Sequence, residues 1–202
     1  MVDDHSIVVL RRRDLPADTE SLARFLIGKS LVRETAEGRL SGRIVEAEAY
    51  PPGDAAGHAF RGLTESNRSL FLEHGHAYIY FAYGSSYMMN VSAERAGIGA
   101  GVLLRAVEPL EGIPLMERRR NTERLVDLCR GPGRLARSFG IDKGLDGLDL
   151  CKGGPLWLGS AARPTGVVGT SVRIGISQEK ERPLRFFERG NHFMSGPLRL
   201  RG

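Results

Sequence analysis

The pattern of apolar and polar residues along the chain predicts several strands. From residue 45 to residue 50, small apolar residues alternate with Glu46, Glu48 and Tyr50. A period of two is typical of a strand, so we predict one over residues 40–50 with one face in the core. On this stretch alone, the simplest interpretation of the other face is exposure to solvent. Glutamate is nevertheless depleted in strands, and a carboxylate fixed beside an aromatic ring suits a general base.

The same period predicts further strands, and apolar residues at helical spacing predict helices between them. The strands are expected over residues 29–33, 76–83, 87–92, 101–107, 172–176 and 184–187. Helices are expected within residues 14–27 and over residues 67–73, 109–120 and 135–139, with an irregular stretch holding Trp157 at 140–169. These elements predict a single mixed α+β domain over residues 1–202, with mostly antiparallel strands and a loosely ordered start at residues 1–13.

Charge and cysteine usage limit the class of protein. The chain has 202 residues and a formal net charge of +5, which favours a polyanionic partner and nucleic acid first. Cys129 and Cys151 match no metal-site spacing, so we expect free thiols in a reducing compartment. The chain shows neither a signal peptide nor an apolar stretch long enough to span a bilayer. We therefore expect no membrane association and no secretion: a cytoplasmic or nucleoid protein if bacterial, a nuclear one if eukaryotic.

Aromatic and basic residues offer a first candidate surface for nucleic acid. All five tyrosines fall between Tyr50 and Tyr87, and Tyr83 lies at the expected tip of a hairpin. Strand tyrosines usually pack in a core, but an exposed aromatic at a tip suits insertion between bases. Backbone phosphates could be met by five arginines, although the simpler interpretation of each is an ordinary surface residue. They are Arg61, Arg68, Arg134, Arg182 and Arg185.

Known catalytic and cofactor motifs give no positive case for a metal or an organic cofactor. The five histidines match no zinc-site spacing, and no phosphate-binding loop, dinucleotide fingerprint or serine nucleophile elbow is present. Arg105 is the unusual residue that remains, because it lies within an apolar strand. A buried guanidinium needs an anionic partner, either a carboxylate or a substrate phosphate.

Eight short blocks follow one another along most of the chain. They are residues 46–50 (EAEAY), 54–58 (DAAGH), 78–84 (YIYFAYG), 89–90 (MN), 102–112 (VLLRAVEPLEG), 131–134 (GPGR), 173–175 (RIG) and 182–186 (RPLRF). Together and in this order, they resemble the alkyladenine (3-methyladenine) DNA glycosylase family. The resemblance implies a single compact domain with a curved, mostly antiparallel sheet, peripheral helices and a protruding β-hairpin.

The same resemblance implies a monofunctional enzyme of base excision repair that has no lyase activity and needs no cofactor or metal. It implies a monomer that binds double-stranded DNA from the minor-groove side and flips out a damaged purine. The N-glycosidic bond of this purine is then hydrolysed. The implied substrates are alkylated or deaminated purines of the 3-methyladenine, 7-methylguanine and hypoxanthine class.

Three matched positions carry the implied chemistry. By position, Glu48 matches the general base that activates water for attack on the sugar. Arg105 matches a residue that holds this water and a nearby phosphate, and the main-chain carbonyl of Ile174 matches another water contact. Among the basic residues, Arg68, Arg134 and Arg182 remain candidates for the DNA backbone.

Five further positions match the implied recognition of DNA. Tyr50, His58 and Tyr80 match the pocket that sandwiches and hydrogen-bonds the flipped base. Asn90 matches a floor residue that disfavours the exocyclic amine of guanine. Tyr83 matches the side chain that fills the gap left in the duplex.

The chain departs from the family pattern at Ser85-Ser86, where many members carry bulky residues, and at Phe187, where some have tyrosine. Two other functions stay open at this point. One is a damaged-DNA-binding module without catalysis. The other is a carbohydrate glycosidase that uses Glu46 and Glu48 as a carboxylate pair, although neighbours on one strand face do not readily flank a substrate bond.

Overall fold

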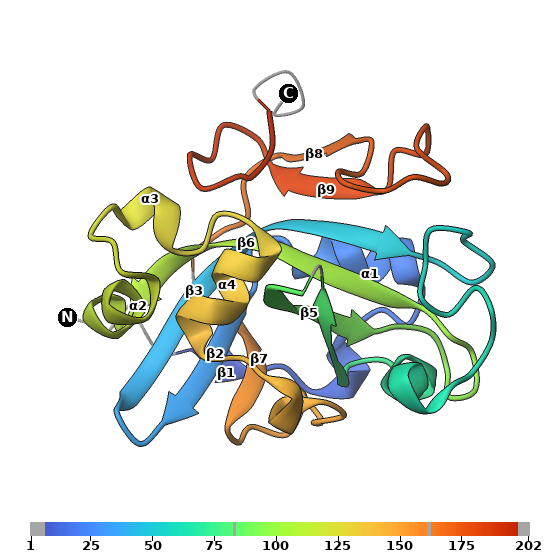
Figure 1. Cartoon of the computed structure of the whole chain (residues 1–202), viewed down its shortest axis with the longest axis horizontal. Coiled ribbons are helices and arrows are strands. Elements are labelled where there is room, and N and C mark those ends of the chain that lie inside the picture. Colours follow the sequence, from blue (N-terminus) through green and yellow to red (C-terminus); the bar gives the residue numbers. More distant parts are fainter. Residues whose placement is uncertain (1–6, 83, 161–162, 198–202) are drawn as a thin grey trace.

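One open antiparallel sheet organises the residues that the computed structural model describes, which are 7–82, 84–160 and 163–197. Its nine strands follow the order β1-β7-β2-β3-β6-β5-β4, while β9 pairs with β3 and β8 pairs with β9 (Figure 1). The strand bounds are β1 Val8–Val9, β2 Ser30–Thr35, β3 Gly38–Tyr50, β4 Ala77–Ala82, β5 Ser86–Ser92, β6 Gly101–Glu111, β7 Leu156–Ser160, β8 Val168–Ser171 and β9 Arg185–Glu188. The fold is thus a single α+β domain, as predicted.

Short helices surround this sheet. They are α1 Thr19–Leu26, α2 Ile113–Arg120, α3 Leu125–Leu128 and α4 Pro132–Phe139, with 3-10 turns at η1 Arg12–Asp14, η2 Glu65–Phe71 and η3 Lys143–Leu145. Helices α2, α3 and α4 gather at one end of the long strands β3 and β6, and α1 lies toward the other end (Figure 1). Asp18 caps α1 by accepting a hydrogen bond from the main-chain N–H of Ser21. Within the described residues, no helix has the length and apolar character needed to cross a membrane.

Strand β3 lies at the centre of the sheet, and its surroundings decide the character of its polar face. It pairs with β6 along most of its length, while its other edge pairs first with β2 and then with β9. Glu46 and Glu48 are both 0% exposed. The solvent-exposed face suggested by local alternation is therefore wrong, because segments remote in sequence cover it.

The β4–β5 hairpin has two distinct faces. Tyr80 lies opposite Met88 across the hairpin, and Phe81 lies opposite Tyr87. Side chains of successive strand residues point to opposite faces, so the two pairs face opposite sides of the hairpin. The predicted tip residue Tyr83 lies outside the described residues.

The structure corrects the prediction of a helix that begins at Pro109. Strand β6 continues to Glu111, and Pro109 pairs with Gly42 where the register of β3 and β6 shifts. Such an irregularity tolerates a residue without a main-chain N–H. Helix α2 begins only after Gly112, whose φ of 74° lies in the left-handed region that glycine favours.

The strand predicted over residues 172–176 is also wrong, because this segment is a loop after β8. The main-chain N–H of Ile174 donates to the Glu48 carboxylate instead of to a neighbouring strand. A local period of two cannot reveal such a distant partner. Strand β7 lies inside the stretch predicted to be irregular, and Trp157 is buried there as expected. The helix predicted over residues 67–73 is the 3-10 turn η2, which begins after Thr64.

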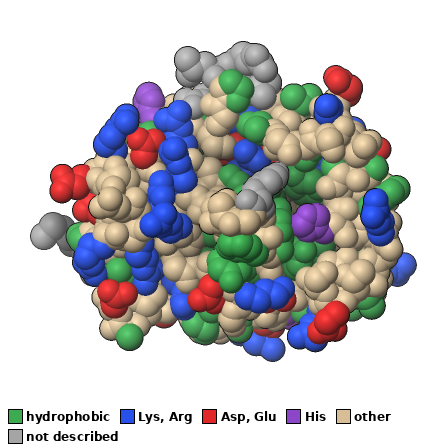
Figure 2. Space-filling view, viewed as in Figure 1, with side chains coloured by type: hydrophobic (Ala, Val, Ile, Leu, Met, Phe, Trp, Pro, Cys, Tyr) green, Lys and Arg blue, Asp and Glu red, His purple; other side chains and the backbone are tan. Residues whose placement is uncertain are grey.

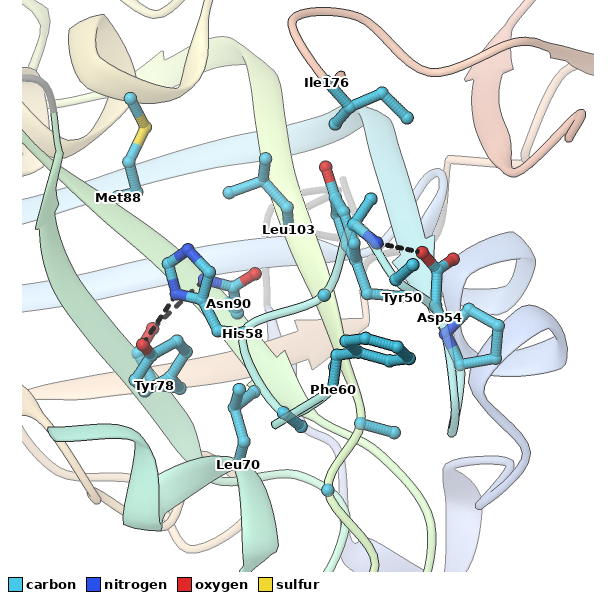
Figure 3. A pocket seen from close by; sticks show the side chains of 18 of the residues that line it. Tyr50, Asp54, His58, Phe60, Leu70, Tyr78, Met88, Asn90, Leu103 and Ile176 are labelled. Carbon is cyan, nitrogen blue, oxygen red and sulfur yellow. Dashed lines mark hydrogen bonds between the residues drawn. The ribbon is translucent and has the colours of Figure 1, made fainter. Parts of the chain in front are cut away.

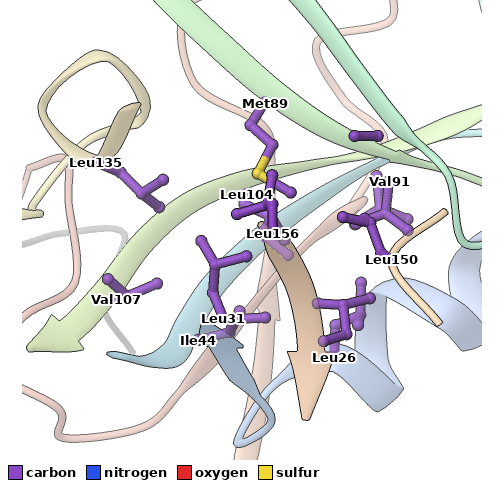
Figure 4. Packing of buried hydrophobic residues seen from close by; sticks show 14 of the residues in the cluster. Leu26, Leu31, Ile44, Met89, Val91, Leu104, Val107, Leu135, Leu150 and Leu156 are labelled. Carbon is purple, nitrogen blue, oxygen red and sulfur yellow. The ribbon is translucent and has the colours of Figure 1, made fainter. Parts of the chain in front are cut away.

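The main core joins residues from several strands and helices (Figure 4). Leu31, Ile44 and Leu104 come from three adjacent strands, and Leu26 of α1 and Leu135 of α4 belong to the same cluster. All five are 0% exposed. This packing fixes β3 and β6, the two strands that carry the central polar residues.

We expect Leu104→Ala to lower the free energy of unfolding by about 2–5 kcal/mol, because it removes apolar contacts and leaves a cavity in the core. Urea denaturation monitored by circular dichroism measures this. Leu110→Ala is the matched control on the same strand, since Leu110 is 45% exposed, and it should change stability by about 0.5 kcal/mol or less. Equal losses in the two variants would contradict the assigned core.

Candidate active site

A cavity of about 410 Å³ opens between the loop after β3, the β4–β5 hairpin and the loop after β8 (Figure 3). This size is within the range of small-molecule sites in proteins. Six of the residues predicted from the sequence line it: Tyr50, His58, Tyr80, Asn90, Arg105 and Ile174. Residues more than 100 positions apart in sequence thus meet at one place.

Glu48 lies directly behind the cavity wall, because three of the lining residues bind its carboxylate. The main-chain N–H of Ile174 donates to Oε1 at 2.7 Å, and the Tyr50 hydroxyl donates to Oε2 at 3.0 Å. Nη1 of Arg105 donates to Oε2 at 3.2 Å. The Ile174 carbonyl also accepts from Arg105 at 3.4 Å. Sequence reasoning pointed to this carbonyl but missed the N–H of the same residue.

Glu46 holds Arg105 in this position. Its Oε1 accepts from Nε of Arg105 at 3.0 Å and from Nε of Arg185 at 2.7 Å. Ser195 closes the group, with its main-chain N–H 2.5 Å from Oε2 and its hydroxyl 2.9 Å from Oε1. The anionic partner expected for Arg105 is therefore a pair of buried carboxylates on β3. Glu46, to which the family resemblance assigned no role, orients the arginine that contacts Glu48.

The two carboxylates differ in basicity. Burial alone would raise the pKa of Glu46, but the nearby charges of Arg105 and Arg185 outweigh burial and lower it. For Glu48, burial outweighs the opposing effect of Arg105 and raises the pKa. Environments that push two carboxyl pKa values apart often separate a structural charge from a catalytic base. Here Glu48 is the more basic of the two.

Aromatic rings form one wall of the cavity. The rings of His58 and Tyr80 are 4.3 Å apart, and Tyr78 stacks behind Tyr80 at 5.4 Å between centroids. The Tyr78 hydroxyl and Nδ1 of His58 are hydrogen-bonded at 2.9 Å (Figure 3). Burial lowers the pKa of His58, which favours the neutral ring at pH 7. Tyr78 was missed as a site residue, although it shares a strand face with Tyr80.

The back of Tyr50 is covered by a second buried ion pair. The Arg173 guanidinium lies 4.6 Å from the Tyr50 ring centroid, and its Nη1 is 2.7 Å from the Asp54 carboxylate. The same nitrogen donates to the Ala49 carbonyl at 3.0 Å. Both Arg173 and Asp54 side chains are fully buried. This pair joins the end of β3 to the two loops that border the cavity.

Asn90 lies on β5 at the base of the cavity, where it is 6% exposed. It pairs in register with Tyr78 on β4 and with Leu103 on β6. Its amide Nδ2 contacts the Tyr78 carbonyl at 3.5 Å, the limit of a hydrogen bond. The side chain therefore presents a polar group in a floor made of strands.

The candidate backbone arginines lie in different environments. Arg61, Arg68 and Arg134 are exposed, and Arg182 is partly exposed beside Asp54. The suggestion of Arg185 as a phosphate contact is wrong, because this residue is 0% exposed and ion-paired with Glu46. Throughout the part of the chain that the structure describes, no three histidine, cysteine or acidic side chains gather in an arrangement that could hold a metal.

Comparison with known proteins identifies the family. The sequence profile described as "Methylpurine-DNA glycosylase (MPG)" matches residues 13–192. A protein of Mesorhizobium japonicum named "Putative 3-methyladenine DNA glycosylase" is 60% identical over 198 residues, which cover 98% of this chain and 94% of the relative. Proteins of the same name are 57% identical in Paraburkholderia phytofirmans, covering 96% of this chain and 91% of the relative, and 46% identical in Rubrobacter xylanophilus, covering 88% and 92%. The chain therefore belongs to the methylpurine-DNA glycosylase family and is a DNA N-glycosylase of DNA repair.

Proposed function

We propose that the protein hydrolyses the N-glycosidic bond of alkylated or deaminated purines in duplex DNA, with Glu48 as the base that activates water. One observation carries this proposal. Glu48 is a fully buried carboxylate of raised pKa, and it is held by Tyr50, Arg105 and Ile174 directly behind an aromatic cavity. The names of the relatives point to 3-methyladenine as one substrate of this class.

The aromatic walls suit a flipped purine. Tyr50 would stack on one side of the base, with His58 and Tyr80 on the other. Alkylation at N3 or N7 gives a purine positive charge, which makes it both a better leaving group and a better partner for aromatic faces. Flipping costs a few kcal/mol and costs least for a damaged base, so the flip itself adds selectivity.

The carboxylate of Glu48 can accept one more hydrogen bond. An ionised carboxylate accepts about four hydrogen bonds, and three donors already contact this one. The water would take the remaining place on Oε1 and be held by the Ile174 carbonyl and Arg105. As the water oxygen bonds to the anomeric carbon, the bond to the purine nitrogen breaks and the water proton passes to Glu48. A positioned base of this kind contributes about 100- to 10,000-fold to the rate.

Asn90 and Tyr83 complete the proposal at the two ends of the flipped nucleotide. Asn90 on the cavity floor would disfavour the exocyclic amine of guanine. Tyr83, between β4 and β5, would fill the gap in the duplex from the minor-groove side. The protein would act as a monomer. The carbohydrate glycosidase alternative loses support, because Glu46 is fully buried and bound by two arginines and Ser195.

We expect Glu48→Gln to bind lesion DNA as the parent does but to lose base release by about 100-fold or more, since the amide cannot take the proton. Chromatography of bases released under single-turnover conditions, from duplexes that each carry one damaged purine, measures this and ranks the substrates. Glu111→Gln makes the same change of side chain at an exposed position outside the cavity, so it is the control and should release bases at the parental rate. Base release by Glu48→Gln at the parental rate would disprove the assignment.

The pH dependence gives a second test. Base release requires ionised Glu48, so activity should fall as the pH decreases through the pKa of this residue. Because that pKa is raised, the midpoint of the acid limb should lie above the ordinary glutamate value of about 4.3. In Glu46→Gln the midpoint should move to lower pH, because the negative charge of Glu46 raises the pKa of Glu48.

The midpoint does not depend on how much of a variant is folded, so it remains readable if Glu46→Gln is less stable. Removing one partner of a buried ion pair costs about 3–5 kcal/mol. A midpoint that stays in place or moves to higher pH would show that Glu46 does not act on the base.

A further inference from the structure

A second hollow lies on the opposite face of the β4–β5 hairpin from the aromatic cavity. It has a volume of about 460 Å³ and lies between the hairpin and α4. Its wall includes Phe81 and Tyr87 of the hairpin together with Arg120, Arg134, Arg137 and Asp142. None of these hairpin residues takes part in the cavity already described.

The hairpin separates the two hollows because its side chains alternate. The cross-strand pair Tyr80 and Met88 lines the aromatic cavity. The next pair along, Phe81 and Tyr87, lines the second hollow, where the two rings pack edge to face with centroids 5.1 Å apart. One thin wall of two strands therefore divides an aromatic cavity from a basic hollow.

The second hollow carries excess positive charge. Three arginines and one aspartate, Asp142, stand among its lining residues. Nε of Arg120 donates to the Leu128 carbonyl at 3.2 Å, and Nε of Arg137 donates to the Arg119 carbonyl at 2.8 Å. Main-chain carbonyls orient these guanidinium groups without neutralising them.

The positive charges of these three arginines repel one another. Partial burial lowers the pKa of Arg120, and the charges of Arg134 and Arg137 lower it further. Arg134 has an acidic partner, since its Nη1 is 3.0 Å from the Asp127 carboxylate, but Arg124 shares the same carboxylate at 3.2 Å. An anion in the hollow would relieve this repulsion. Figure 2 shows lysine and arginine side chains gathered on the same part of the surface, over α2, α3 and α4.

Helix α4 holds the basic side of the hollow at a fixed distance from the hairpin. A Cβ added at Gly133 would lie 2.9 Å from Cβ of Ser86, which is too close for two carbon atoms. Only glycine lets the helix approach the hairpin so closely. Arg134 and Arg137 are three residues apart on α4, so they lie side by side on one face of the helix.

We propose that this hollow holds the sugar–phosphate backbone of the DNA strand opposite the lesion. The inference rests on the proposed function, in which the hairpin enters the duplex where the damaged nucleotide leaves it. A hairpin inserted at that point has one DNA strand on each of its two faces. The strand that gives up its nucleotide lies on the side of the aromatic cavity, so the opposite strand lies along the basic hollow.

Neutral methylphosphonate linkages test this strand assignment. Each would replace one phosphate near the lesion, in either strand of a duplex that carries a stable abasic analogue. Fluorescence anisotropy would measure binding to the parent and to the Arg134→Gln/Arg137→Gln double variant. Because the analogue has no base to release, the measurement does not depend on catalysis. A parent that binds but releases no base from damaged duplexes would disprove the proposed function separately.

We expect the double variant to bind about 10-fold or more weakly than the parent, with a shallower dependence of affinity on salt. A methylphosphonate at the contacted position of the opposite strand should weaken the parent similarly but should have little further effect on the double variant. Arg13→Gln is the control, because it also replaces an arginine by glutamine. The Arg13 side chain is 86% exposed and lies outside the hollow. Binding by this variant should equal that of the parent.

Two results would overturn the proposal. One is an unchanged affinity of the double variant. The other concerns the strand in which a methylphosphonate weakens binding of the parent but has little further effect on the double variant. If this strand is the lesion strand and not the opposite one, the lesion strand lies along the hollow.

Discussion

The buried charge network on β3 is the constraint on which the site depends. Two carboxylates and two arginines lie in the interior, and ions are costly to bury unless each is paired. Glu46 satisfies Arg105 and Arg185 together, which leaves Arg105 fixed against Glu48. Glu46 and Arg185, which do not line the cavity, therefore help to set the geometry of the Glu48 carboxylate.

The sheet provides the rigidity that this network requires. Register shifts between β3 and β6 occur near Glu46, at the point where β9 joins the other edge of β3. Bulges of this kind re-aim side chains and are often found next to active sites. Here they coincide with the residues that project toward Arg105. Eight of the cavity-lining residues lie on strands β3 to β6, and the Arg173–Asp54 ion pair joins two of the bordering loops to the end of β3. Residues on strands hold the geometry of a site more precisely than residues on loops.

Local patterns predicted strands β2 to β6 and β9 but missed β1, β7 and β8, and the ordered motifs predicted the family. Neither could predict how the site is closed. Ile174 and Ser195 are 126 and 149 residues from the carboxylates that they bind. Their hydrogen bonds turn a face that looked solvent-exposed into a buried one. The loop at residues 172–176 was mistaken for a strand for the same reason, because its main-chain donor is used by a distant side chain. By contrast, Tyr78 followed from the strand period and could have been recognised as the support of His58.

The arginine behind Tyr50 has a consequence for what the site can distinguish. An aromatic ring attracts cations through the negative charge on its faces, and Arg173 already occupies one face of this ring. The other face is correspondingly less attractive to a second cation. Stacking of a flat base on this ring therefore depends more on the shape and area of the base than on its charge. In the proposed function, the Tyr50 ring would then hold neutral and charged purines with more similar strength, and discrimination between them would shift from binding to the ease of breaking the N-glycosidic bond.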